Sequence, residues 1–457
     1  MKTIKYIIGI AAVISFMSFF AACSSDEPSI PNGIDNPASY VNGNYETNNL
    51  RFSVINGQAT VLGFITDNVK ADIPSHIAIL KDKEWKNCKV VAIAPNAFKQ
   101  SIIEEVIIPS TITSIGISAF ENSHLKILNI SNGIIYERAF MGCPLLEKVS
   151  LGNGVTKLGK EAFANCSSLN STSFGNAITS IGEKCFINTA LENVTIPSGN
   201  IEKRAFYNTP ILEVSLGNNV ERIEEAAFNQ GRANPMYSLT IGTNVKYIAH
   251  DAFRSSAKIT YNAIDCKIGN APYYGHLSCR QELILGNEVV NIPNNCFSGG
   301  GFTKLVIPNS VITIGDEAFM MGAIKEIDFG NSVRKIGKSA FSYMWDYAIG
   351  RRPLKEVYLP NSIEIIDDEA FREAGLEKVV IGTGIKSIGD YAFYLNDNME
   401  VFIFKSLTPP VLGTSAINFV TTCDHIYVPD ESFEAYANAL GYGEPFLKRL
   451  STYNGSY

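Results

Sequence analysis

An Ala-Phe pair that returns at a nearly fixed spacing constrains this chain more than any other feature of its sequence. Two of the pairs are Cys-Phe, and the aromatic members are Phe98, Phe120, Phe140, Phe163, Phe186, Phe206, Phe228, Phe253, Phe297, Phe319, Phe341, Phe371 and Phe393. Most steps between them are 20–25 residues, one is 30, and one of 44 equals two periods. A fixed period of this length is typical of a solenoid, in which each coil buries its apolar face only against its neighbours. The repeat between Phe253 and Phe297 has therefore lost its marker.

Each period also carries an apolar pattern ahead of the phenylalanine. In one repeat it reads Leu376, Val379, Ile381 and then glycine, and the last two apolar positions alternate with period two. That alternation predicts a short strand with one buried face, which Gly or Pro ends. A second apolar pair, Ile385 and Ile388 in the same repeat, leads through a polar turn to the next Ala-Phe. A small residue three positions after most phenylalanines predicts an inward corner with little room.

The combined pattern L-x-x-V-x-I-P-x-x-V-x-x-I-G-x-x-A-F resembles the Treponema-type, or BspA-like, leucine-rich repeat over about residues 90 to 405. The resemblance implies a leucine-rich-repeat solenoid, a curved right-handed coil with a parallel β-sheet of short strands. Short helical or irregular turns are expected on the other side. It also implies a surface lipoprotein of Bacteroides-like bacteria, a family with several adhesins and no catalytic residues to transfer. We assign residues 91–405 to this array.

The chain before the array predicts a β-hairpin cap. Residues 45–90 include two alternating stretches that are separated by Asn56-Gly57, a strong signal for a tight hairpin turn. An atypical end is expected because a terminal repeat must cover the open core.

Residues 406–457 predict a last repeat and a C-terminal cap. We expect Asp430 to be the N-cap of a helix from Glu431 to Leu440, because a glycine follows at position 441. Phe433 and Tyr436 of this helix should then face the core.

The N-terminus has the pattern of an export signal. Lys2 and Lys5 precede an apolar run that ends in Ala21-Ala22-Cys23, so residues 1–22 are expected to be a lipoprotein signal peptide. Cys23 resembles the acylated cysteine of bacterial lipoproteins, and two acyl chains would hold the protein stably in outer-membrane lipid. Residues 23–44 lack hydrophobic periodicity and predict a flexible tether, and their first acidic residues resemble a surface-export tag. We therefore expect a surface-exposed outer-membrane lipoprotein.

Composition and motifs argue against catalysis and nucleic-acid binding. The formal net charge is −7, without the clustered Lys and Arg that phosphate binding needs. The five histidines are scattered, no C-x-x-C is present, and no spacing predicts a metal site or a cofactor. The adjacent-repeat cysteines Cys143 and Cys166 could form a disulfide after export. We expect no enzyme, although a glycosidase carboxylate pair depends on spatial proximity that sequence does not give.

The long step before Phe371 contains an insertion that is the main candidate for ligand binding. It is about eight residues longer than its neighbours and carries Tyr343, Trp345, Tyr347, Arg351 and Arg352. Tyr, Trp and Arg dominate interface hot spots, because they bury a large area at a low entropy cost. The alternative is that Trp345 only pins the insertion onto its own coil.

Two further departures from the repeat are also candidates. The repeat that lost its marker contains Tyr273 and Tyr274, and a short insertion spans residues 232–237. Insertions in solenoids form loops that often lie on the functional face.

The sequence thus favours a binding or adhesion scaffold for an extracellular protein or glycan, and we expect a monomer. One rival is an accessory protein or enzyme of a surface glycan-uptake system. Another is a structural surface-coat protein without a specific ligand.

Overall fold

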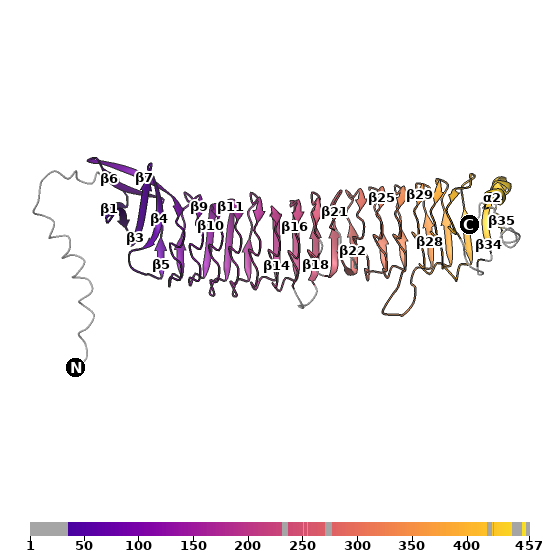
Figure 1. The fold of residues 1–457 in the computed structure, drawn as a ribbon, viewed down its shortest axis with the longest axis horizontal. Coiled ribbons are helices and arrows are strands. Elements are labelled where there is room, and N and C mark those ends of the chain that lie inside the picture. Colours follow the sequence, from indigo (N-terminus) through magenta and orange to yellow (C-terminus); the bar gives the residue numbers. More distant parts are fainter. Residues whose placement is uncertain are drawn as a thin grey trace, which may run out of the picture.

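The array is an elongated stack of coils, as the repeat predicts (Figure 1). The computed structural model describes residues 35–230, 236–249, 251–253, 255–269, 277–417, 423, 425–440 and 450–453. The expected signal peptide, Cys23 and the first part of the tether lie outside these residues. Within the described ranges, no helix is long and apolar enough to cross a membrane.

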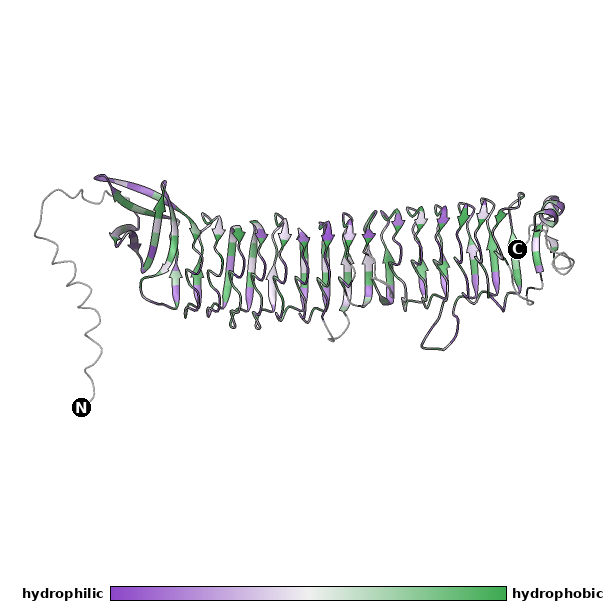
Figure 2. Ribbon diagram, in the orientation of Figure 1, coloured by the Kyte–Doolittle hydropathy of each residue, from purple (hydrophilic) through white to green (hydrophobic). Residues whose placement is uncertain are grey.

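Two rows of parallel strands run along the stack. The row of longer strands comprises β5 (Lys70–Asp72), β8 (Glu105–Ile107), β10 (Ile127–Ile135), β11 (Lys148–Leu158), β12 (Ser171–Ser173), β14 (Asn193–Ser198), β16 (Glu213–Asn219), β18 (Met236–Ile241), β20 (Ser256–Tyr261), β22 (Cys279–Leu285), β24 (Lys304–Val306), β26 (Glu326–Asp328), β28 (Glu356–Leu359), β30 (Lys378–Ile381), β32 (Val401–Phe404), β34 (His425–Pro429) and β35 (Leu450–Tyr453). The second row comprises β9 (Ser114–Ile115), β13 (Ser180–Ile181), β15 (Asn200–Ile201), β17 (Arg222–Ile223), β19 (Tyr247–Ile248), β21 (Lys267–Ile268), β23 (Asn291–Ile292), β25 (Thr313–Ile314), β27 (Lys335–Ile336), β29 (Ile365–Ile366), β31 (Ser387–Ile388) and β33 (Val411–Leu412). The C-terminal ends of the long strands β10 and β11 also belong to this second row. Equivalent residues pair from coil to coil, as Val379 does with Val357 and Phe402. Apolar and hydrophilic residues alternate along the coils (Figure 2).

On the side where short helical or irregular turns were expected, the turns contain the second row of two-residue strands. The helical segments of the described chain all lie at the C-terminal end. Each two-residue strand keeps one residue inward and pairs it with its equivalent in the next coil, as Ile366 pairs with Ile388.

The N-terminal cap is a mixed sheet, with antiparallel hairpins joined by the parallel pairs β1–β6 and β4–β7, and it continues into the array. Its strands are β1 (Pro37–Val41), β2 (Asn44–Thr47), β3 (Leu50–Ile55), β4 (Gln58–Phe64), β6 (His76–Lys81) and β7 (Glu84–Ile93). The hairpin prediction is confirmed, because Asn56 and Gly57 join β3 to β4 with φ of 50° and 74°. The tether prediction extended too far, since β1 and the start of β2 lie within residues 23–44. Only Ala38 of β1 is buried, so the sequence of that strand shows no period.

The C-terminal cap contains the expected helix in a modified form. A 3₁₀ turn, η1 (Asp430–Ser432), precedes α2 (Phe433–Leu440). Asp430 lies inside the turn and makes no capping bond, because Pro429 precedes it as the cap residue. Tyr436 is fully buried and donates to the Ser406 carbonyl at 3.0 Å, and Phe433 packs against the core, as expected. The parallel strand β35, which the sequence did not predict, adds to β34.

The repeated phenylalanines form a buried column on one side of the coils. From Phe98 to Phe120 the ring centroids are 4.9 Å apart, and from Phe140 to Phe163 they are 5.2 Å apart and nearly parallel. A second column runs from Phe297 to Phe393. Stacked aromatic pairs add to the free energy that burial of their area supplies. The column accounts for the Ala-Phe period.

A tight corner places each phenylalanine, and in most repeats its backbone is left-handed on both sides. In one repeat Lys184 and Asn188, two residues before and after Phe186, have φ of 55° and 58°. Backbone hydrogen bonds continue through the corner, where the Phe186 amide donates to the Ala205 carbonyl at 2.7 Å. The small residue three positions later is buried and often donates inward, as the Thr189 hydroxyl does to the Phe186 carbonyl at 3.0 Å. The predicted inward corner is confirmed.

The adjacent alanines Ala226 and Ala227 test the left-handed corner. Ala226 has φ of 54°, whereas Ala227 is fully buried and outside the left-handed region. We expect Ala226→Gly to raise the free energy of unfolding by about 0.5–1 kcal/mol, because glycine relieves the strain at a modest entropy cost. Ala227→Gly should lower it by about 1 kcal/mol. Denaturation midpoints of the full chain measure both, and equal destabilisation by the two changes would contradict the assignment of strain.

Candidate functional site

The predicted insertion leaves the column undisturbed and projects from an edge of the solenoid. The rings of Phe341 and Phe371 stack with centroids 5.3 Å apart, although 30 residues separate them in sequence. The extra residues lie between the Phe341 corner and β28, where a loop extends below the array (Figure 1). We call residues 343–352 the inserted loop.

Asp346 closes the inserted loop on itself. Its amide donates to the Arg351 carbonyl at 3.0 Å, and its Oδ1 accepts the Ala348 amide at 2.9 Å. The Gly350 amide donates to the Asp346 carbonyl at 2.8 Å, and Lys325 Nζ lies 3.6 Å from Asp346 Oδ2. The side chain of Asp346 is almost fully buried. The insertion is therefore a defined turn, which lowers the entropy cost of binding through it.

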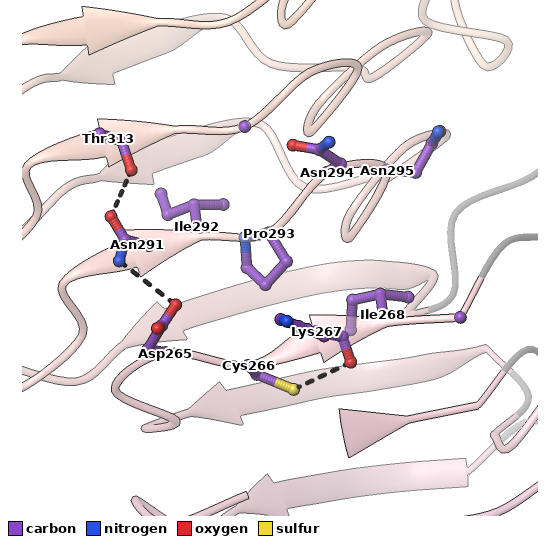
Figure 3. Close-up of a pocket in the computed structure, with 12 residues that line it drawn as sticks. Asp265, Cys266, Lys267, Ile268, Asn291, Ile292, Pro293, Asn294, Asn295 and Thr313 are labelled. Carbon is purple, nitrogen blue, oxygen red and sulfur yellow. Dashed lines mark hydrogen bonds between the residues drawn. The ribbon is translucent and has the colours of Figure 1, made fainter. Parts of the chain in front are cut away.

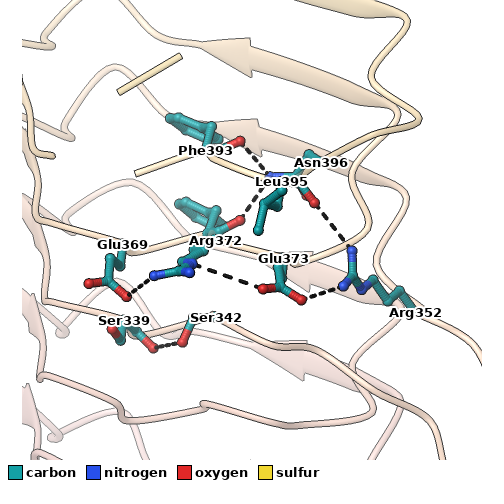
Figure 4. A network of polar contacts seen from close by, with 10 residues as sticks. Ser339, Ser342, Arg352, Glu369, Arg372, Glu373, Phe393, Leu395 and Asn396 are labelled. Carbon is teal, nitrogen blue, oxygen red and sulfur yellow. Dashed lines mark hydrogen bonds and ion pairs between the residues drawn. The ribbon is translucent and has the colours of Figure 1, made fainter. Parts of the chain in front are cut away.

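Tyr343 and Arg352 attach the two ends of the inserted loop to the following repeats. The Tyr343 amide donates to the Arg372 carbonyl at 2.8 Å, and the Arg372 guanidinium lies 5.5 Å from the Tyr343 ring centroid. Arg352 forms an ion pair with Glu373 at 2.5 Å and donates to the Leu395 carbonyl at 3.2 Å (Figure 4). Both predicted site residues are therefore anchors, a structural role that the sequence alternative had given to Trp345.

Arg372 lies at the centre of the network that holds these anchors. It pairs with Glu369 at 3.2 Å, and its Nε lies 4.0 Å from Glu373, beyond hydrogen-bond distance. Its guanidinium also lies 5.7 Å from the Tyr394 ring centroid, on the side away from Tyr343. Burial acts to lower the pKa of Arg372, but Tyr343, Glu369 and Glu373 raise it above its ordinary value. The guanidinium thus stays charged between two tyrosines.

The remaining side chains of the inserted loop are available to a partner. Tyr347 is 82% exposed and Trp345 is 37% exposed, while Arg351 and Ile349 also face solvent. The Trp345 amide donates to the Gly322 carbonyl at 3.0 Å, so its backbone is fixed while part of the ring is accessible. The structure therefore brings all five predicted residues into one loop but divides them by role.

Sequence reasoning missed aromatic residues beside this loop. Tyr391 and Tyr394 make an edge-to-face contact with centroids 5.4 Å apart, and Arg372 links Tyr394 to Tyr343. Tyr358 on β28 is half exposed, and Lys378 lies 5.5 Å from its ring centroid. The sequence signal for these residues is a tyrosine at a repeat position that points outward. That position can be recognised only after the repeats have been aligned with one another.

The second predicted site, Tyr273 and Tyr274, lies outside the described residues. Its flanks show that the lost marker interrupts the second strand row between β21 and β23. A cavity of about 550 Å³ lies there, and Asn291 links Asp265 to Thr313 by hydrogen bonds along its wall (Figure 3). Tyr261 contacts Phe297 edge-to-face with centroids 5.5 Å apart, where the phenylalanine column is broken.

Neutral groups surround the break in the column. Burial raises the pKa of Tyr261 well above its ordinary value, with further contributions from Cys296 and Cys266. Burial likewise raises the pKa of the Cys266 thiol to about 12. These groups are protonated at neutral pH, so they provide no charge for an ionic ligand. Of the third candidate, residues 232–237, the structure describes the buried Met236 and Tyr237, which is 65% exposed.

The cysteines provide packing and hydrogen bonds. The eight described cysteines are all buried free thiols, so the disulfide considered between Cys143 and Cys166 is not formed. Cys143 Sγ lies 3.2 Å from the Phe120 carbonyl, and Cys166 Sγ lies 3.1 Å from that of Phe140. These thiols occupy the same inward corner as Thr209, whose hydroxyl likewise donates to a phenylalanine carbonyl of the preceding coil, that of Phe186, at 3.0 Å. No group of three or more potential metal ligands is found among the described residues.

The repeat matches a known family over most of the array. The chain matches the family described as BspA type leucine rich repeat region (6 copies) at residues 91–201, 199–281, 290–349 and 343–440, which is more than half of its length. The chain belongs to this family. No curated protein matches it.

Solved structures with a related arrangement include a leucine-rich repeat protein from Bacteroides ovatus. It is 18% identical, with 89% of this chain and 99% of that chain covered and a TM-score of 0.42. The pneumococcal vaccine antigen PcpA is 18% identical, with coverage of 91% and 98% and a TM-score of 0.34. A leucine rich cell surface protein from Faecalibacterium prausnitzii is 18% identical, with coverage of 81% and 94% and a TM-score of 0.29.

The division of the inserted loop into anchors and exposed residues predicts different effects for its two arginines. Arg352→Ala removes the contacts to Glu373 and Leu395 and should increase chymotrypsin cleavage at Tyr347 several-fold, with little change in overall stability. Arg351→Ala, which removes an exposed side chain, is the matched control and should leave cleavage unchanged. Limited proteolysis with mass spectrometry measures both rates. Equal cleavage of the two variants would show that Arg352 does not anchor the loop.

Proposed function

We propose that this protein is a lipid-anchored surface scaffold that binds an extracellular protein through the exposed side of the inserted loop. The observation that supports this most directly is the pairing of a closed, anchored turn with exposed Trp345 and Tyr347. Large aromatic side chains on a preorganised support bind with a low entropy cost. A projecting loop is convex, so it fits a groove on a protein better than it cradles a glycan.

The ion pairs around the loop argue for binding and against a glycosidase. Glu369 and Glu373 are the carboxylates beside the inserted loop, and each is paired with Arg372 or Arg352. These ion pairs hold both carboxylates against the protein, whereas a glycosidase needs a pair of carboxylates that is free to face the substrate. Membership in a repeat family whose regular array accounts for most of the chain agrees with a scaffold role.

Binding through the exposed aromatic side chains predicts that their removal selectively lowers the affinity for the partner. The double change Trp345→Ala and Tyr347→Ala should weaken binding to the partner at least tenfold, as hot-spot truncation commonly does. Tyr237→Ala, which removes a comparably exposed tyrosine from β18, should leave affinity unchanged. Full-length protein would be screened against host matrix proteins and a glycan array, and then titrated on the best hit. If the double variant and the Tyr237→Ala variant bound the partner equally well, recognition would lie elsewhere. A glycan as the sole hit would favour the glycan-uptake alternative.

The surface location rests on the N-terminal pattern, in which Cys23 follows Ala21-Ala22. Acylation of Cys23 would anchor the protein, and the acidic residues after it would direct it outward. We expect Cys23→Ala to move the protein from the membrane fraction to the soluble fraction of the cells. Protease added to intact cells should degrade the parent protein, whereas a periplasmic control protein stays intact. Protection of the parent protein in intact cells would contradict surface exposure.

A further inference from the structure

The N-terminal cap contains the second of the chain's two tryptophans, beside a cavity of about 330 Å³. The β6–β7 hairpin forms its floor, with Ala78 opposite Asn87 and Leu80 opposite Trp85. Residues alternate across a strand, so Ala78, Asn87 and Trp85 share the face that points away from buried Ile77 and Cys88. The small side chain of Ala78 leaves room between its larger neighbours.

The chain just before β1 forms one wall of this cavity. The Ala78 amide donates to the Asn36 carbonyl at 3.1 Å, and the Asn48 side chain donates to Asn36 Oδ1 at 2.9 Å. Asp35 therefore lies at the rim, where its carboxylate is exposed. His76, whose Nδ1 lies 3.2 Å from Ser75 Oγ, completes the described lining.

The Trp85 ring is the apolar surface of this site. Its Nε1 is buried without a hydrogen-bond partner, so the N–H is not accessible to a ligand in the cavity. The side chain nevertheless lines the cavity. Tryptophan in a partly open pocket commonly presents an apolar ring to a ligand. A ligand with an apolar face and hydroxyls at its edge would contact both the ring and the polar groups around it.

The described lining restricts the chemistry of that ligand. It holds one carboxylate, two amides, the Ser75 hydroxyl, the His76 imidazole and the Trp85 indole, without Lys or Arg. An anion would meet no guanidinium or ammonium group there, and a metal ion would lack enough carboxylate ligands. The volume lies at the small end of ligand pockets, which span about 300–1,000 Å³.

We propose that this pocket binds a neutral sugar residue. The sugar ring lies against Trp85, and Asp35 and Asn87 bind its hydroxyls. A small organic cation is the competing ligand for a tryptophan beside a carboxylate, but it favours several large aromatic walls, and Trp85 is the one large aromatic side chain of the described lining. The pocket lies in the N-terminal cap, whereas the inserted loop projects from the C-terminal half of the array, so the pocket is independent of the proposed protein-binding site (Figure 1).

Intrinsic fluorescence can test this site alone, because the full chain with Trp345→Phe retains Trp85 as its only tryptophan. Glucose, galactose, mannose, fucose and N-acetylglucosamine would each be titrated, with choline chloride and inorganic phosphate as controls. We expect a saturable change in emission with at least one sugar and none with phosphate. The absence of saturation by any sugar at concentrations on the order of tens of millimolar, a range typical of weak sites, would overturn the proposal. Saturation by choline alone would assign the pocket to a cation instead.

Single substitutions at the lining residues then test the assigned contacts, with affinities measured by calorimetry. Asp35→Asn and Asn87→Ala should each weaken the sugar that binds by about tenfold, the effect of losing a hydrogen bond in a pocket. Glu84→Gln, which removes a carboxylate from the same hairpin outside the pocket lining, should bind as the parent does. Trp85→Phe keeps a smaller aromatic ring and should weaken binding without abolishing it. Parent-like affinity in Asp35→Asn and Asn87→Ala would overturn the site.

Discussion

Backbone hydrogen bonds pass from each coil to the next through the phenylalanine corner as well as through the two strand rows. The Phe163 amide donates to the Cys185 carbonyl at 2.8 Å, and the Phe371 amide donates to that of Ala392 at 2.7 Å. A buried amide without a partner is costly, so every coil must reproduce the corner of its neighbour. The left-handed residues, the alanine and the small inward residue all follow from this constraint. The stacked rings then fill the space that the corner encloses.

This constraint decides where the chain can depart from its repeat. The inserted loop begins at Tyr343, the second left-handed residue of the Phe341 corner, and returns before β28, so both paired segments keep their register. Its own hydrogen bonds are supplied locally by Asp346 and across coils by Arg352. Between Phe253 and Phe297 the Ala-Phe marker is missing from the sequence, and the second strand row is interrupted between β21 and β23. An insertion outside the ladder is therefore tolerated, whereas loss of the marker coincides with a break in the row.

Sequence alone predicts the parts of this molecule that obey the period. The strands, the phenylalanine column and the hairpin at Asn56 follow from spacing and turn chemistry, and the structure confirms them. The division of the inserted loop does not follow, because Tyr343 and Arg352 are anchored by residues 20 to 50 positions away that share no local pattern with them. β1 was missed because one buried alanine gives no periodic signal. The cavity beside Trp85 was missed because three separate segments form it.

The regular faces of the array offer a partner few unmet charges. Along the longer strands, Lys258 pairs with Glu282 at 2.9 Å and Lys355 with Glu377 at 2.5 Å, each across adjacent coils. Such exposed ion pairs contribute little to stability, but within each pair the two opposite charges neutralise each other. A partner that docked on this face would have to displace them and would gain no more than it lost. Recognition is therefore expected where the repeat is interrupted, at a convex aromatic loop in the array and at a concave pocket in its cap. The two shapes suit different ligands, because a projecting loop enters a groove of a large partner, whereas a pocket encloses a small one.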